Sequence, residues 1–339
     1  MTVLYYRPCV QTDPLRSPQA KTLAGGWAWF DRVEVLSRNA EPRLIPIADV
    51  PADVLARLCA PREAVAGLDM SRPNLMGILN VTPDSFSDGG LYVHPADATR
   101  HALDMVNEGA DIIDIGGEST RPGASYVPDD EEVARTAPVI AAIRDASPVP
   151  ISIDTRKAVV AKHALDAGAT LINDVYAFTH DAALAGVAAR SGAPVCLMHA
   201  QGDPEVMQDN PHYDNVVLDV YDFLEDRIKV AEAAGIDRAQ IIVDPGIGFG
   251  KNMAHNLALL NRISVFHGLG CGVLLGASRK RFIGTIGNAP DAKDRVAGSV
   301  AVALAAVAQG IQILRVHDVA HTKQALAVWQ AVLSGEYII

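Results

Sequence analysis

The fold is decided by a repeating unit that is clearest in residues 96–120, which read ADATRHALDMVNEGADIIDIGGEST. Residues 96–108 are amphipathic and alanine-rich, as in a helix, and Gly109 follows as a residue that readily adopts the left-handed turn ending one. The apolar run 112–115 comes next and exits into glycines and polar residues. A helix, a glycine and a short buried strand with a polar exit form one repeat of an α/β protein.

The same unit repeats from residue 74 onward. About eight apolar runs alternate with helical stretches over roughly 260 residues, as in a (β/α)8 barrel, or TIM barrel. Unbroken apolar runs are typical of strands buried on both faces. An open doubly wound sheet is the alternative, less favoured because no Gly-x-Gly-x-x-Gly follows the first strand. The predicted strands are 75–79, 112–115, 150–153, 171–172, 195–198, 241–243, 273–275 and 311–314, and the other predicted helices are 159–167, 229–234 and 296–309, each followed by a glycine.

The first part of the chain lacks this repeat. We predict a small αβ extension of unknown role over residues 1–72, followed by the barrel over residues 73–339. A weak alternating pattern between Trp27 and Val35 indicates strand. Residues 50–68 have helix-compatible spacing interrupted by prolines.

Composition excludes several classes of protein. The chain has 339 residues, of which 49% are hydrophobic, and a formal net charge of −11, which argues against a nucleic-acid partner. Its four cysteines are far apart and suggest neither disulfides nor a zinc site. No secretory signal is visible, and the longest apolar stretch, residues 296–308, is shorter than the roughly 18 residues of a spanning helix. We therefore expect a soluble cytoplasmic protein without a membrane partner.

Carboxylates and an amide follow three of the predicted strands. Asp154 and Asp244 end the third and sixth strands, and Asn173 ends the fourth, so all three belong at the ligand-binding face of a barrel. A single aspartate here is as often a helix cap or an ion pair. Two of them together favour a site for a 2-aminopyrimidinone ring, because a carboxylate accepts two parallel hydrogen bonds. Lys280 could meet a ring carbonyl.

Basic residues at the same face indicate an anion site. Arg315 and His317 are two residues apart at the end of the eighth strand, where both side chains point the same way. Taken alone they would more often be a surface pair, but Thr120, Arg121 and Asn80 converge on the same barrel mouth. No spacing of histidine, glutamate or cysteine residues indicates a structural metal site. We therefore expect any cation to be Mg²⁺ shared with phosphate oxygens and water, with Asn80 as a weak ligand.

The sequence offers no arrangement for nucleophilic catalysis. Ser278 is followed by arginine and lysine and does not lie in a Gly-x-Ser-x-Gly turn, and Cys196 lies inside an apolar strand. This pattern favours an enzyme that holds two substrates and stabilises charge without a covalent intermediate.

These motifs together resemble the dihydropteroate synthase family. Residues 76–90, MGILNVTPDSFSDGG, resemble its first signature, and residues 114–123, DIGGESTRPG, its second. The runs DPGIGFGK at 244–251, SRK at 278–280 and RVHD at 315–318 match the family in the same order. The resemblance begins near the first barrel strand and leaves the extension outside it.

The resemblance implies a transferase that condenses 6-hydroxymethyl-7,8-dihydropterin diphosphate with p-aminobenzoate, giving 7,8-dihydropteroate and diphosphate in folate biosynthesis. It also implies Mg²⁺, a homodimer and a sulfonamide target. Two loops, at residues 83–90 and 119–127, are expected to be mobile and to close over both substrates. The implied catalytic residues are Asp154, Asp244, Lys280 and Arg121; the implied substrate-binding residues are Thr120, Asn173, Met198, Ser278, Arg315, His317, Phe86 and Pro122; and the implied metal-binding residue is Asn80.

Within that set, Asp154, Asn173, Asp244 and Lys280 are implied to bind the pterin, with Met198 against its ring. The implied diphosphate ligands are Thr120, Arg121, Arg315 and His317. Ser278 is implied to receive the benzoate carboxylate, in a pocket that Phe86 and Pro122 help to form.

Three alternatives stay open at this point. A corrinoid-dependent methyltransferase barrel would share the pterin-recognising aspartates but has no need of the Arg315 and His317 pair. A non-catalytic binding subunit would be expected to lack Arg121, Lys280 or Arg315, and all three are present. A dehydrogenase is disfavoured because the dinucleotide glycine loop is missing.

Overall fold

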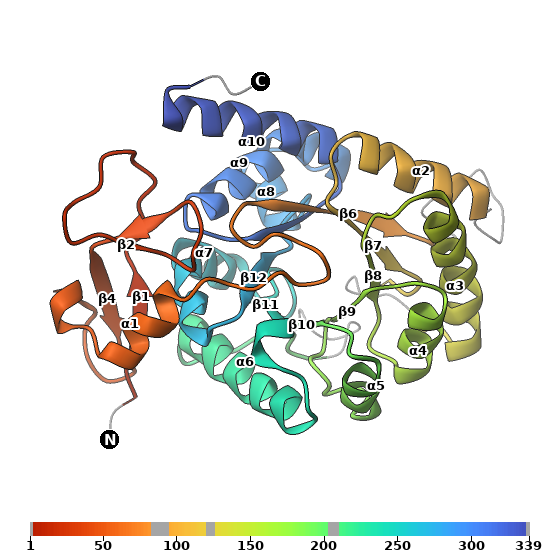
Figure 1. Ribbon diagram of the computed structural model, residues 1–339, viewed down its shortest axis with the longest axis horizontal. Helices are drawn as coiled ribbons and strands as arrows, with labels where there is room; N and C mark the ends of the chain where they lie inside the picture. The colour runs from red at the N-terminus through yellow and green to blue at the C-terminus, as the bar shows by residue number, and fades with distance from the viewer. Residues whose placement is uncertain (1–2, 83–94, 120–125, 203–209, 337–339) are drawn as a thin grey trace.

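The computed structural model describes residues 3–82, 95–119, 126–202 and 210–336 (Figure 1). Its main feature is a closed barrel of eight parallel strands, which run β6 to β13 in order around the ring. The predicted (β/α)8 barrel is therefore confirmed, with every predicted strand within a few residues of an observed one. The strands are β6 (Asn74–Asn80), β7 (Ile112–Gly116), β8 (Ile151–Asp154), β9 (Leu171–Asp174), β10 (Val195–Met198), β11 (Ile241–Asp244), β12 (Gly272–Leu275) and β13 (Ile313–Val316).

Helices surround this ring. The four predicted helices are all present, although the one predicted at residues 229–234 is only the end of the longer helix α6. Gly109, Gly168, Gly235 and Gly310 all have positive φ, between 82° and 113°, as the predicted left-handed turns require. The helices are α2 (Pro95–Asn107), α3 (Asp129–Ala146), α4 (Ala158–Asp166), α5 (Ala183–Ser191), α6 (Val216–Ala233), α7 (Met253–Asn261), α8 (Arg281–Ile286), α9 (Val296–Val307) and α10 (Val319–Ser334).

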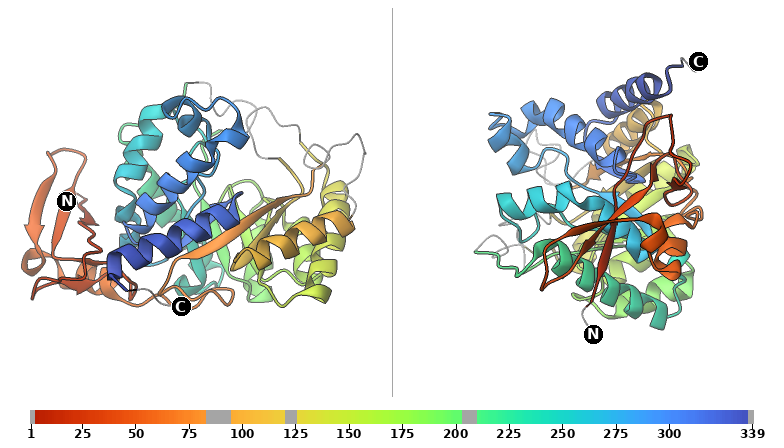
Figure 2. Two further views of the ribbon diagram at one scale, coloured as in Figure 1. Left: turned by 90° about the horizontal axis from the view of Figure 1, so that it is seen from above. Right: turned by 90° about the vertical axis from the view of Figure 1, so that its left-hand side faces the viewer.

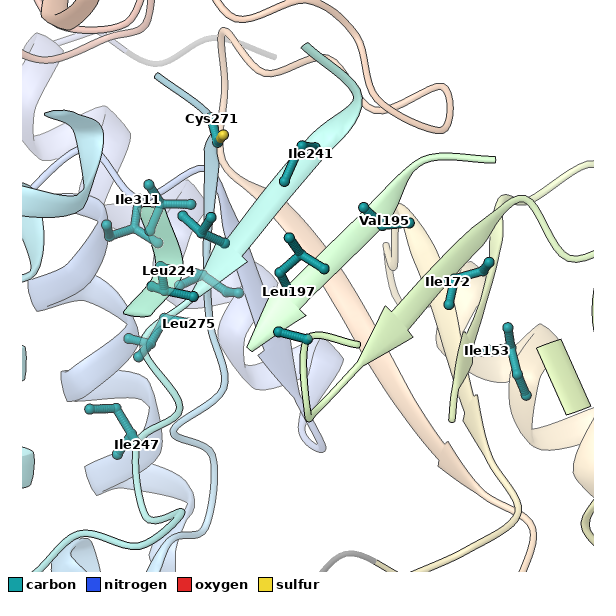
Figure 3. Close-up of a cluster of buried hydrophobic side chains, with 14 of the residues drawn as sticks. Ile153, Ile172, Val195, Leu197, Leu224, Ile241, Ile247, Cys271, Leu275 and Ile311 are labelled. Carbon is teal, nitrogen blue, oxygen red and sulfur yellow. The ribbon is translucent and has the colours of Figure 1, made fainter. Parts of the chain in front are cut away.

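The largest core lies between the strands and the helices (Figure 3). Ile153, Ile172 and Leu197 point outward from three neighbouring strands, and none of them exposes any surface. Leu224 of α6 packs in the same cluster. Burial on both strand faces explains why the strands read as unbroken apolar runs.

The N-terminal extension is a small αβ structure on one side of the barrel (Figure 2). The predicted alternation between Trp27 and Val35 corresponds to two short strands. The helix predicted within residues 50–68 occupies only the stretch between two prolines, because Ala60, which precedes Pro61, takes an extended conformation. The extension contains β1 (Tyr5–Pro8), β2 (Lys21–Thr22), β3 (Trp29–Phe30), β4 (Arg32–Leu36), β5 (Arg43–Pro46) and α1 (Ala52–Cys59).

Side-chain contacts fix the extension to the barrel. Tyr5 donates to Asp222 of α6 at 2.8 Å, and Trp27 donates to the carbonyl of Val307 at the end of α9 at 3.0 Å. Arg62 is partly buried and donates to the carbonyl oxygens of His267 and Cys271 at 3.0 and 3.1 Å. The extension is thus a packed part of the molecule.

The last part of the extension closes the N-terminal end of the barrel. Val65, Leu68 and Met70 are almost completely buried and pack against the inward-facing side chains of the strands. This apolar plug belongs to the barrel core although it precedes β6. Its strand partners are Met76, Ile112, Leu171, Cys196, Ile242, Leu274 and Ile313.

Among the described residues, we find no helix whose length and apolar character would allow it to cross a membrane.

Candidate active site

The predicted site residues meet at the C-terminal end of the barrel. Asn80 is the register partner of Gly116, which in turn pairs with Asp154, and Asp154 pairs with Asn173. Met198 and Asp244 are partners on the next two strands. Parallel strands in register therefore place these side chains on one continuous rim, which the sequence could only imply.

A half-buried arginine connects two carboxylates inside this rim. Arg315 of β13 donates from Nε to Asp114 at 2.6 Å and from Nη2 to Asp154 at 2.7 Å. Asn173 lies 3.3–3.4 Å from the oxygens of Asp114. From the sequence, Arg315 is expected in a basic group beside an acidic one, whereas in the structure its guanidinium binds Asp154 directly.

Asp114 was missed as a site residue by the sequence analysis. It lies inside β7 between isoleucines and is completely buried. A charged residue within an otherwise apolar strand was the available signal, because an ionised side chain is rarely buried without a partner. Its partner Arg315 comes from β13, about 200 residues later in the chain, and only the closure of the barrel reveals the pair.

Burial raises the pKa values of the two predicted aspartates, Asp154 and Asp244. It raises the pKa of Asp154 to about 7, against the opposing effect of Arg315 and with a further increase from Asp114. It raises the pKa of Asp244 to about 6, against a hydrogen bond from the Gly246 N–H at 2.7 Å and the charge of Lys280. Such shifts are typical of functional sites, where a ligand replaces the lost water.

One oxygen of Asp154 is left without a partner. Oδ1 is buried and has no hydrogen-bond partner among the described residues, while Oδ2 binds Arg315. An unsatisfied buried carboxylate oxygen is costly, so its presence points to a ligand with an N–H or O–H group.

Asp244 and Arg315 face the same space. A Cβ atom added to Gly276 would lie 3.5 Å from Asp244 Oδ2 and 3.8 Å from Arg315 Cδ. The absence of a side chain at Gly276 therefore keeps this space open between them. Lys280 lies nearby, with its Nζ 4.0 Å from the centre of the Phe249 ring.

Met198 forms one apolar wall of the mouth. It packs in a small cluster with Val175 and Tyr176, against which Phe249 is also packed. Phe249 was not predicted as a site residue. An apolar wall beside paired polar groups suits a flat heterocycle.

Ser278 and His317 form a second polar pair. Ser278 Oγ lies 3.0 Å from His317 Nδ1 and accepts from the His317 backbone N–H at 3.2 Å. Arg279, next to Ser278, has a φ of +57° and binds Asp318, next to His317, at 2.5 and 3.0 Å. This ion pair holds the exits of β12 and β13 together.

A buried charge cluster fixes both described ends of the loop after β7. Glu118 binds Arg156 at 3.1 Å and accepts from the Val127 N–H at 3.0 Å. Lys157 lies 2.7 Å from Glu132 and donates to the carbonyl of Val127. The residues that directly follow Asp154 thus anchor this loop.

Four predicted residues, Phe86, Thr120, Arg121 and Pro122, lie outside the described residues, as does most of the two loops predicted to close over the substrates. Asn80 lies inside them: its Oδ1 and the Oδ2 of Asp154 are both 3.8 Å from the Cβ position of Gly116. Among the described residues, no group of three or more His, Cys, Asp or Glu side chains is arranged for a metal ion.

Comparison with known proteins agrees with this geometry. A family model described as "Pterin binding enzyme" matches residues 76–317. The dihydropteroate synthase of Escherichia coli K12 is 48% identical over 269 residues, covering 79% of this chain and 95% of that protein. The chain belongs to this family. The Bacillus subtilis dihydropteroate synthase is 46% identical, with coverage of 77% and 88%.

Solved dihydropteroate synthases also share the fold. The Xanthomonas albilineans enzyme with 4-aminobenzoic acid is 49% identical, with a TM-score of 0.74 over 79% of this chain and 96% of that one. The Yersinia pestis enzyme with a sulfonamide drug is 48% identical, with a TM-score of 0.75 and the same coverage. Residues before 76 lie outside the family match.

Proposed function

We propose that this chain condenses 6-hydroxymethyl-7,8-dihydropterin diphosphate with p-aminobenzoate, forming 7,8-dihydropteroate and diphosphate in folate biosynthesis. The observation that carries this proposal is the ion-paired group of Asp154, Asp114 and Arg315 near Asp244 and Lys280. It lies at the mouth of a barrel that is 48% identical to a dihydropteroate synthase. The Xanthomonas albilineans enzyme, solved with 7,8-dihydropteroate, is 46% identical and supports the same product.

The pterin is assigned to the side of the mouth lined by carboxylates. The unpartnered Oδ1 of Asp154 and the carboxylate of Asp244 are the acceptors for its amino and ring N–H groups. Asn173 can both donate and accept, Lys280 is the cation for a ring carbonyl, and Met198 packs against the ring.

The diphosphate is assigned to Arg315 and His317, together with Thr120 and Arg121 from the family resemblance. Because Arg315 already binds two carboxylates, it lies between the pterin and its departing group. As the carbon–oxygen bond breaks, negative charge moves to the diphosphate and positive charge to the pterin methylene, which Asp154 and Asp114 can stabilise. The amine of p-aminobenzoate is neutral at pH 7 and needs no dedicated base.

The p-aminobenzoate carboxylate is assigned to Ser278, whose hydroxyl His317 holds in place. Phe86 and Pro122 complete this pocket by resemblance. Ser278 and Lys280 leave the same strand, so the two substrates would meet above β12.

Mg²⁺ is proposed as the cofactor. The fit rests on the chemistry of the donors: an amide oxygen of Asn80 beside Asp154, together with diphosphate oxygens and water, is the oxygen-only set that Mg²⁺ prefers. Asn80 would hold the ion, which would offset charge growing on the diphosphate.

A cytoplasmic homodimer is proposed as the working form. One face of α9 is core, with Ala303, Ala306 and Val307 buried, and its other face is apolar and accessible. The neighbouring α10 exposes Val328 and Val332 by 60% and 75%. A second copy would cover this apolar surface, and sedimentation measurements would test it.

One assay tests the function. Diphosphate release should require both the pterin diphosphate and p-aminobenzoate, should yield 7,8-dihydropteroate by mass spectrometry, and should be inhibited competitively by a sulfonamide. Chelation of Mg²⁺ should abolish it and added Mg²⁺ should restore it. Diphosphate release that does not depend on p-aminobenzoate would contradict the proposal.

A further inference from the structure

Lys251 is a buried lysine beside the mouth that the proposed reaction leaves without a role. Only 2% of its surface is exposed. Its Nζ lies 2.8 Å from His199 Nδ1, 3.3 Å from the His199 carbonyl oxygen and 2.9 Å from the Phe249 carbonyl oxygen. Three acceptors match the three N–H groups of an ammonium, so the geometry favours a charged lysine and a His199 ring protonated on Nε2.

These acceptors belong to two different loops. His199 follows β10, and Phe249 lies in the loop after β11. The loops touch through their backbones, since a Cβ at Gly246 would lie 1.9 Å from the His199 carbonyl oxygen. Gly246 has a φ of +67°, which also favours glycine. Lys251 binds the carbonyl oxygens of both loops and so fixes one against the other.

Holding Phe249 has a consequence at the pterin side of the mouth. The Phe249 ring lies under the Lys280 ammonium at 4.0 Å and packs against the cluster that contains Met198. A ring in this position attracts the cation and limits where it can lie. The backbone position of Phe249 therefore helps to set the position of Lys280.

We propose that Lys251 is a positioning residue for pterin recognition, holding Phe249 under Lys280 and placing an additional buried positive charge near Asp244. The inference rests on the proposed function, because it assigns Asp244 and Lys280 to the pterin. Lys251 itself does not touch the substrate.

The charges around Asp244 support this arrangement. The cations that act on it are Lys280 after β12, Arg315 within β13 and Lys251 after β11. Burial lowers the pKa of Lys251 well below its usual range, but the charge of Asp244 and the three acceptors around Nζ act against that decrease and favour the ammonium. Burial and the charge of Asp244 raise the pKa of the Cys196 thiol on β10. Burial and the charge of Lys251 lower the pKa of the His199 ring. Loss of the Lys251 charge should therefore raise the pKa of Asp244.

The test compares Lys251→Met with a matched control, Tyr213→Phe. Tyr213 donates to the carbonyl of Gly250 at 2.8 Å, so the control also removes one hydrogen bond to this loop but leaves Phe249 held. Isothermal titration with 6-hydroxymethylpterin measures pterin affinity from about pH 5 to about pH 8, and steady-state kinetics measure the KM for each substrate.

For Lys251→Met we expect pterin affinity to fall by at least about tenfold. The KM for p-aminobenzoate should stay unchanged, and the pH below which pterin binding is lost should move upward. Tyr213→Phe should match the wild type in pterin affinity, in the KM for p-aminobenzoate and in the pH dependence of pterin binding. Equal losses in the two variants, or wild-type pterin affinity in folded Lys251→Met, would overturn the inference.

If Lys251→Met does not fold, Phe249→Leu replaces it, since it removes the ring under Lys280 and leaves Lys251 in place. It should reproduce the loss of pterin affinity, and unchanged affinity would overturn the inference. Wild-type turnover is measured separately. A wild type that binds pterin but forms no dihydropteroate would contradict the proposed function. The pterin affinities of the variants would still show whether Lys251 positions the pterin site.

Discussion

The two ends of the barrel are built from the same eight strands but differ in what they bury. At the N-terminal end, Val65, Leu68 and Met70 close the barrel with apolar side chains. At the C-terminal end, the ionisable side chains of Asp114 and Asp154 are buried and pair with Arg315. One end is packed for stability and the other holds groups that are costly to bury.

This difference separates the residues that stabilise the molecule from those that act on ligands. Apolar burial stabilises the folded chain whether or not a substrate is present. Asp154 and Asp244 at the mouth have raised pKa values, and Asp154 has one unpartnered oxygen, so both are most stable when a ligand is bound. Buried carboxyl groups of this kind lower the stability of the protein when no ligand is bound. The predictions below test this contrast.

Arg315→Ala should have the largest effect at the mouth. It removes the guanidinium that binds Asp114 and Asp154, leaving two buried carboxylates unpaired. We expect the binding free energy of the pterin diphosphate to weaken by about 2–5 kcal/mol, which is about thirtyfold to a few thousandfold in affinity. Titration calorimetry measures it, and wild-type affinity would remove Arg315 from the site.

Leu68→Ala changes the apolar N-terminal end of the barrel. It should lower the stability of the protein without changing ligand binding. Leu68 is 2% exposed, and its truncation leaves a cavity in the apolar plug. The free energy of unfolding should fall by about 2–5 kcal/mol, with KM values unchanged below the melting temperature. Leu44→Ala is the control, because Leu44 is 60% exposed. A plug variant that altered pterin KM would mean that the two ends are coupled.

Asp244→Asn should stabilise the protein while weakening pterin binding. Burial raises the pKa of Asp244 to about 6, so the folded chain favours the neutral acid. The wild type therefore loses stability as the pH rises from about 4 through 6, and the amide does not. Above pH 7 the variant should be more stable by up to about 3 kcal/mol, and near pH 3 this gain should vanish. Chemical denaturation at both pH values measures it; a gain that did not depend on pH would argue against ionisation as the cause.

Arg38→Ala should have the smallest effect. Arg38 joins the extension to α6 through Asp219 and Asp222, both at 2.6 Å, but it is 37% exposed. An exposed ion pair contributes at most about 1 kcal/mol. Thermal unfolding should shift little, and a large loss would show that charge, more than burial, holds the extension.

Much of the fold and part of the candidate site could be predicted from the sequence. The eight strands, the glycine turns and the polar exits are local patterns, so they were predictable to within a few residues. Asp154, Asn173 and Asp244 were predicted from their places at strand ends and do lie on one rim. The roles assigned to them and to the other site residues stay predictions.

The sequence by itself determined the barrel, its repeat and its family signatures, because strand burial and helix termination depend on neighbouring residues. Only the tertiary structure decided that Arg315 meets Asp114 and Asp154, that Lys251 joins two loops, and that residues 65–70 close the barrel. Each of these contacts joins segments distant in the chain. Their energies depend on distance and burial, which no local pattern of residues specifies.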